Sequence, residues 1–220
     1  MGSEIVSALV TLSAAFVGAW SAFKLEDRAR KRRTVEERIA AGNRAMFVLM
    51  RMFNELFVYQ QRVLEPVRAR DARSVLLLKN LSRNHEGLRF EVEKLSFLLE
   101  TAHRQVLTEL LIEEERFYTV VGMINKRSDM HLADVQPALE KAGIGEGQDH
   151  SEVDVDLALG TRRFRTMQRL TADIFTHVDK NVISLLEMSK RLHSALSKLY
   201  PKARFIRFEP DKAALEKAET

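Results

Sequence analysis

Hydrophobic and polar positions divide the chain into one uncharged run near its start and long amphipathic stretches after it. The uncharged run, IVSALVTLSAAFVGAWSAF, covers residues 5–23, and the basic segment KLEDRARKRR follows it at residues 24–33. A helix of this length, rising about 1.5 Å per residue, is roughly 28 Å long and matches the hydrocarbon core of a bilayer. The pattern predicts a transmembrane anchor over residues 1–23.

Beyond the basic segment, apolar residues recur every three or four positions in three long stretches, as in helices with one buried face. The first stretch runs from Asp27 to Leu64, ends at Pro66, and is placed to continue the anchor as one rod. The second runs from Arg89 to Asn125. The third lies between Gly160 and Pro201 and has the most regular spacing, which suits a bundle helix or a coiled-coil strand.

The remaining segments carry turn signals. Residues 134–142 predict a short helix with Asp134 as its N-cap and Pro137 in its first turn. GIGEGQDHSE, residues 143–152, predicts a loop. The stretch KARFIRFEP near the C-terminus predicts either a strap on the bundle or a basic and aromatic contact with lipid headgroups, and we favour the strap.

The predicted fold class is therefore all-α. It consists of an N-terminal single transmembrane helix and an elongated antiparallel helical bundle over residues 34–200, with three long helices plus short ones. Residues 201–220 form a C-terminal tail. The long second stretch is expected to bury one side that includes Leu95, Leu99, Ala102, Val106 and Leu110.

The two sides of the anchor differ in side-chain size. Within an arc of about 80°, one side carries only small residues: Ser7, Thr11, Ala14, Gly18 and Ser21. In lipid, small residues let two helix backbones approach each other, so we expect the anchor to self-associate through this small face and the chain to be a homo-oligomer. The alternatives are an anchor without a helical partner and a helix that packs its bulky side on the rest of the chain.

The formal net charge of +4 is concentrated directly after the anchor. Residues 24–33 hold two acids and six bases: Lys24, Arg28, Arg30, Lys31, Arg32 and Arg33. Basic residues on one side of a transmembrane span indicate the cytoplasmic side, so we expect the N-terminus outside and the body in the cytoplasm. We expect the six bases to contact anionic lipid. The membrane that suits this arrangement best is a bacterial inner membrane. The rest of the chain is balanced in charge, which argues against nucleic acid as a partner.

Residues with catalytic potential are sparse. The chain has no cysteine, and its one spacing typical of metal ligands is the pair Glu100 and His103, half of a ferritin-like di-iron set. The acidic run at residues 113–115 reads as a solvated face. Arginines at 162, 163, 165 and 169 are interpreted as a solvated face or a face paired with those acids, or as a site for phosphate or anionic lipid. We therefore expect no enzyme activity, no cofactor and no metal.

Three functions remain open at this point. The leading hypothesis is a membrane-tethered interaction, scaffold or regulatory protein that self-associates at the cytoplasmic face. The second is a membrane-active effector, a toxin or defence component, whose assembled anchors perturb the bilayer. The third is a ferritin-like metal-binding enzyme.

Overall fold

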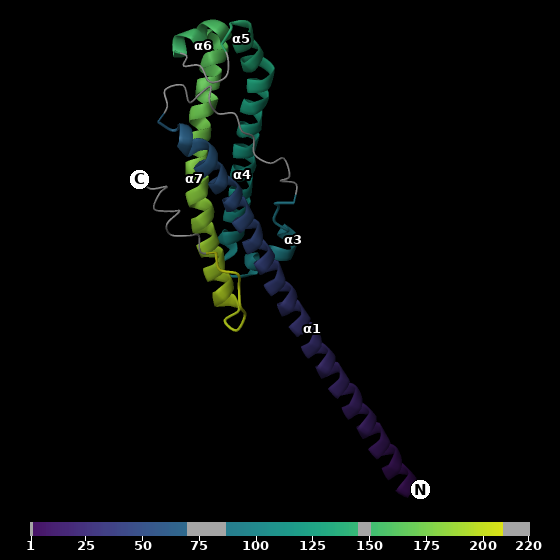
Figure 1. Ribbon diagram of the computed structural model, residues 1–220. Coiled ribbons are helices and arrows are strands. Elements are labelled where there is room, and N and C mark those ends of the chain that lie inside the picture. The colour runs from purple at the N-terminus through teal and green to yellow at the C-terminus, as the bar shows by residue number, and fades with distance from the viewer. Residues whose placement is uncertain (1, 70–86, 145–150, 209–220) are drawn as a thin grey trace.

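The computed structural model describes residues 2–69, 87–144 and 151–208, and for residues 2–15 it describes the helix without its side chains. The described part is helical and contains no β-strand. A bundle of long helices occupies one end of the molecule, and the N-terminal part of the first helix projects from it (Figure 1). The all-α prediction is confirmed for these residues.

Helix α1 (Gly2–Tyr59) is one continuous helix of 58 residues, about 87 Å long at 1.5 Å per residue. It passes without a break through the predicted anchor, the basic segment and the first bundle helix, as the rod prediction required. A π-helical turn (Gln60–Leu64) and a 3₁₀ turn (Glu65–Val67) end it, with Pro66 inside the last turn. Pro66 lacks the N–H that a further helical turn would need.

Helices α4 (Arg104–Met130) and α7 (Thr161–Leu199) run antiparallel. At one end of the pair, Arg191 donates to Glu109 at 2.7 Å, and at the other end Arg127 donates to Thr171 at 3.2 Å. Helix α7 therefore begins beside the end of α4 and descends along it (Figure 1).

The bundle half of α1 lies against the same helix α7, also antiparallel. Gln60 donates to Asp179 at 2.7 Å, and Gly42 lies opposite Leu196 near the other end of the contact. Helix α7 thus packs on α1 and α4 of its own chain. The regular apolar positions of α7 are occupied within the chain and belong to one core: Ile174, Val178, Val182, Leu185, Met188, Leu192 and Leu196.

The prediction of one helix from Arg89 to Asn125 is wrong. A short helix α3 (Val92–Leu95) and a 3₁₀ turn (Ser96–Glu100) come first, and Thr101 is extended, with φ −118° and ψ 173°. The hydroxyl of Thr101 accepts the backbone N–H of His103 at 3.1 Å and helps to start α4. Leu99 lies in the 3₁₀ turn, which has three residues per turn, so a spacing of four from the buried Leu95 leaves it exposed.

The end of the bundle farthest from the N-terminus also differs from the prediction. Helix α4 passes through a π-helical turn (His131–Val135) into α5 (Gln136–Lys141), and no side chain caps α5, so the N-cap role of Asp134 is wrong. Pro137 does lie in the first turn of α5. Helix α6 (Glu152–Leu159) was not predicted, although Ser151 and Asp154 form a capping box at its start. A small second core joins these elements: Val135, Val155, Leu159, Phe164 and Met167.

Residues 201–208 form the strap that the sequence predicted. Asn43 of α1 accepts the backbone N–H of Ile206 at 2.8 Å, and Phe208 packs edge-on against Phe53 with ring centroids 4.8 Å apart. The strap follows α1 and covers part of its outer side. Residues 70–86 and 209–220 lie outside the described residues.

Candidate functional site

The first candidate site is the part of α1 that leaves the bundle. From Phe16 to Glu37 its side chains are exposed, apart from the partly covered Asp27, and the first buried residue is Ala41. Large apolar side chains are exposed at the start of this stretch, including Phe16 at 72%, Phe23 at 68% and Leu25 at 64%. We call these residues the apolar girdle: Phe16, Val17, Trp20, Phe23 and Leu25.

The girdle covers a wide part of the helix circumference. At 100° per residue, its five members extend over about 200°. A helix lying on the surface of a protein core needs an apolar stripe of roughly 100°. One helical neighbour is too narrow to cover the girdle, which therefore fits an apolar medium better than a single protein contact.

Part of the predicted anchor lies beyond what the structure describes. Residues 5–15 have no described side chains, and of the predicted small face only Gly18 and Ser21 are described. Within the described residues, no helix is both long enough and apolar enough to cross a membrane.

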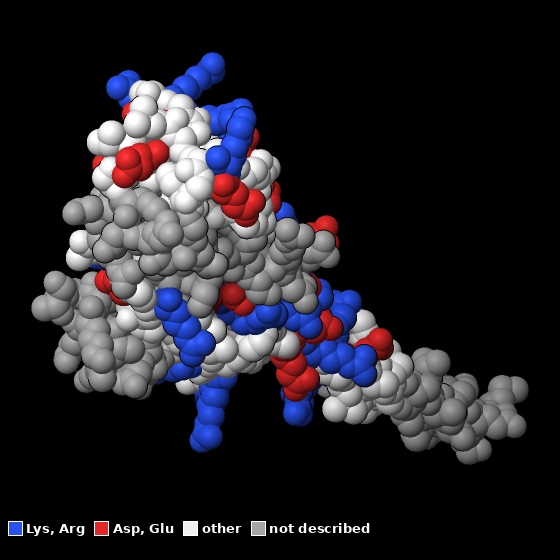
Figure 2. All heavy atoms as spheres, turned by 45° about the horizontal axis from the view of Figure 1, so that its top comes forward, with Lys and Arg blue, Asp and Glu red and all other residues white. Residues whose placement is uncertain are grey.

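Six basic residues begin next to Phe23, at the end of the girdle, and continue along the exposed helix. We call them the basic collar: Lys24, Arg28, Arg30, Lys31, Arg32 and Arg33. In Figure 2, Lys and Arg side chains gather where α1 leaves the bundle. Two members of the collar are paired within the helix, Lys31 with Asp27 at 2.7 Å and Arg32 with Glu36 at 2.8 Å. The hydrogen bond from Lys31 holds the pKa of Asp27 below its usual value. The ammonium group of Lys24 lies over the ring of Trp20, 5.4 Å from its centroid.

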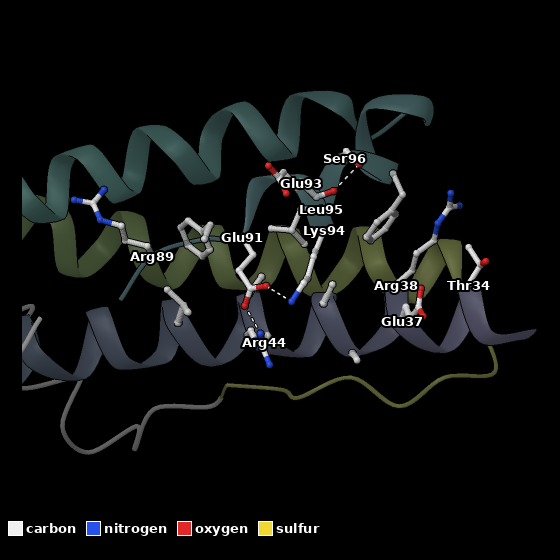
Figure 3. A pocket seen from close by; sticks show the side chains of 16 residues that line it. Thr34, Glu37, Arg38, Arg44, Arg89, Glu91, Glu93, Lys94, Leu95 and Ser96 are labelled. Carbon is white, nitrogen blue, oxygen red and sulfur yellow. Dashed lines mark hydrogen bonds and ion pairs between the residues drawn. The ribbon is translucent and has the colours of Figure 1, made fainter. Parts of the chain in front are cut away.

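The second candidate site is a groove between α1 and residues 89–97, with a cavity volume of about 500 Å³ (Figure 3). Its apolar floor is formed by Ala41, Ala45, Val48, Phe90, Leu95 and Phe97. The small alanines of α1 create the hollow, and the aromatic rings close it from the other side.

The rim of the groove is charged and held by ion pairs. Glu91 bridges the groove by pairing with Arg44 of α1 and with Lys94 (Figure 3). The guanidinium of Arg38 lies over the ring of Phe97, 5.5 Å from its centroid. The described lining contains no histidine, and its one serine, Ser96, donates its hydroxyl to a backbone carbonyl at 2.7 Å. The groove is therefore equipped to bind a side chain or small apolar group, and it lacks a nucleophile paired with a base.

The groove depends on Glu114, which the sequence placed on a solvated face. Glu114 is buried, accepts the backbone N–H of Phe90 at 2.8 Å and pairs with Arg89 at 3.0 Å. These contacts hold the non-helical segment before α3 against α4, and this segment forms one wall of the groove. The neighbouring Glu113 is also buried and accepts the hydroxyl of Ser184 at 2.7 Å. Only Glu115 of this run is exposed.

The arginine run at the start of α7 does not meet those acids. Arg163 instead lies 3.9 Å from Asp134, and Glu113 pairs with Arg116 of its own helix at 2.7 Å. The predicted contact between the run and residues 113–115 is therefore wrong.

A buried arginine is the polar feature that the sequence analysis missed. Arg127 is 2% exposed and donates to Thr171, and burial lowers its pKa to about 10. Burial also raises the pKa of the nearby Tyr59 to about 12 and lowers that of His131. The sequence contained a sign of this burial, because Arg127 follows the apolar Ile124 by three positions and therefore lies on the same, buried side of α4.

The candidate metal pair is separated by the break before α4. Glu100 ends the 3₁₀ turn and lies 3.5 Å from Arg38, and His103 is the residue before α4, with the extended Thr101 between them. A Glu-x-x-His pair places both ligands on one face only inside a continuous helix. Among the described residues, no group of three or more potential ligands could hold a metal ion.

Comparison of the chain with protein-family models, with curated proteins and with solved structures finds no match.

Proposed function

We propose that this chain is a membrane-tethered interaction protein. Its N-terminal helix inserts into a bilayer, and the bundle presents a binding groove at a set distance from one membrane face. The observation that carries the proposal is the apolar girdle, which is exposed over about 200° of an isolated helix. Lipid covers such a surface from every side.

The order of side chains along α1 supports insertion. Residues 5–23 carry no charge, and each Leu, Ile, Phe or Val at the bilayer centre contributes about 0.3 to 0.6 kcal/mol to insertion. Trp20 and Lys24 follow at the end of the run, where amphipathic rings and bases are enriched at membrane interfaces. The basic collar on this side favours a cytoplasmic bundle.

The continuity of α1 determines the distance between membrane and bundle. Residues 26–40 separate the girdle from the first buried residue of the bundle, Ala41, and span about 22 Å as a helix. Because the same helix enters the core, the spacer is a stiff extension of the bundle. The groove begins at Thr34 and lies where the spacer meets the bundle.

The small face of the anchor supports self-association as part of this function. A Cβ added at Gly18 would meet no atom of the chain within 4 Å, so the chain itself gives no packing reason for a glycine at this position. Such a face suits contact with a second copy in the membrane. In lipid there is no hydrophobic driving force between helices, so close packing of two backbones must stabilise the pair.

The test of tethering is extraction of the full chain from membranes. We expect wild-type protein to stay with the membrane in alkali, and a reporter fused after Thr220 to read as cytoplasmic. An arginine at the bilayer centre costs about 2.5 to 3.5 kcal/mol, so Ala14→Arg should release the protein, and Ala14→Leu is the control that should not. Release of wild-type protein into the alkaline supernatant would refute the proposal.

A further inference from the structure

We propose that Lys24 and Arg28 bind the phosphate groups of anionic phospholipids, so that α1 selects the lipids that surround it. This inference rests on the proposed insertion of α1. It assigns a ligand class to two of the six collar residues and leaves the others outside the contact.

The position of each base along the helix separates these two from the rest. Lys24 directly follows the girdle residue Phe23, and Arg28 lies about 6 Å further along the helix and about 40° around it. The polar headgroup layer of one leaflet is roughly 5 to 7 Å thick. Both side chains therefore start within that layer or at its edge, and Arg30 and Arg33 start about 10 Å or more beyond Phe23.

The pairing pattern excludes Lys31 and Arg32, and position along the helix excludes Arg30 and Arg33. Lys31 and Arg32 are already paired with carboxylates of the same helix. Within the described residues, the side chain of Arg28 makes no ion pair, and Lys24 lies over the ring of Trp20. Two acids lie between them in the sequence: Asp27 is paired with Lys31, and Glu26 starts on the opposite side of the helix from both bases. Lys24 and Arg28 thus offer two positive charges on one side of the helix, and neither is in an ion pair with a carboxylate.

The chemistry of the two side chains suits a phosphodiester. Arg28 offers a planar fork of donors that matches two phosphate oxygens, and Lys24 adds a mobile point charge one helical turn away. Each Lys or Arg close to an anionic membrane surface contributes about 1 kcal/mol to the attraction, which corresponds to about a fivefold preference for anionic over neutral lipid.

Trp20 makes this preference measurable, because it is the single tryptophan of the chain and lies 5.4 Å from Lys24. The full chain is reconstituted in vesicles of phosphatidylcholine and phosphatidylglycerol, with bromine on the acyl chains of one lipid or of the other at equal mole fraction. Brominated lipid quenches a tryptophan that it touches. We expect brominated phosphatidylglycerol to be enriched next to Trp20, by about fivefold for each of the two bases.

Two variants with the same change in net charge provide the comparison. Arg28→Gln should lower the enrichment about fivefold, and Arg33→Gln, which removes an exposed base beyond the headgroups, should leave it unchanged. Equal quenching by both brominated lipids would overturn lipid selection and leave insertion standing. Absence of quenching by either lipid would overturn insertion itself. Equal loss of preference in both variants would replace binding at Lys24 and Arg28 by a diffuse attraction of net charge.

Discussion

Two glycines in the middle of bundle helices should respond to the same substitution with opposite signs. A Cβ at Gly42 of α1 would lie 2.9 Å from both methyl carbons of Leu196 and 3.2 Å from the ring of Phe205. A Cβ at Gly122 of α4 would meet no atom within 4 Å. Gly122→Ala therefore reports the gain in helix stability alone, and Gly42→Ala reports the same gain together with overpacking.

The sizes of the helix-propensity gain and of the overpacking cost decide whether each substitution stabilises or destabilises the fold. Replacing glycine by alanine inside a helix stabilises it by about 0.5 to 1 kcal/mol. Adding a methyl group to a filled core costs about 1 to 3 kcal/mol. Leu196 is fully buried, so its methyl groups have little room to move. Gly42→Ala should lose roughly 1 kcal/mol, and Gly122→Ala should gain up to about 1 kcal/mol.

The assay is thermal unfolding of the full chain in detergent, followed by circular dichroism. For a chain of this size 1 kcal/mol corresponds to a change in Tm of about 2 to 4 °C. We expect Gly122→Ala to melt higher than wild type and Gly42→Ala lower. Leu196→Ala should reduce the penalty at Gly42, because it removes the atoms that the new Cβ meets. If both glycine variants gained equal stability, the close approach of α1 and α7 at Gly42 would be incorrect.

Three further substitutions test other parts of the molecule. Gly18→Ile should weaken oligomers of the anchor in a membrane crosslinking assay because it separates the two backbones, and Leu12→Ile on the bulky side should leave them unchanged. Glu114→Ala should cost about 1 to 3 kcal/mol in the free energy of unfolding, because the buried N–H of Phe90 loses its acceptor; an unchanged Tm would contradict this role. Burial lowers the pKa of His131, so the unfolded chain binds more protons than the folded chain and the fold loses stability as the pH falls below 6.5. His131→Gln should remove this loss of Tm at low pH. If Tm of the variant fell with pH as steeply as that of the wild type, another group would cause the loss.

The break before α4 shows where prediction from spacing fails. Residues 89–125 carry an apolar period that continues across Thr101, and local propensity alone favours one helix. The stretch is also non-helical at its start, where the buried carboxylate of Glu114 accepts the backbone N–H of Phe90. That contact joins residues 24 positions apart, which the periodicity of one segment does not reveal. The non-helical start forms one wall of the groove, and the extended Thr101 separates Glu100 from His103.

The sequence was sufficient to predict one candidate site, the girdle and the collar, but not the other, the groove. The girdle and the collar are continuous in sequence, so an uncharged run followed by bases was enough to find both. The groove is assembled from α1 and from residues 89–97, and its apolar floor appears only when Ala41 and Ala45 of one segment meet Phe97 of the other. Burial of Arg127 likewise depends on three helices meeting around it.

The sequence by itself determined the long helices, because a 3.6-residue apolar repeat and a proline stop act within one segment. It also located the uncharged run and its basic boundary, since hydrophobicity and charge are properties of single residues in order. Only the tertiary structure decided which charges are buried, where the second stretch breaks and where the groove forms. These outcomes depend on which distant side chain reaches a buried polar group, because an unpaired polar group inside the core costs more than a lost turn of helix.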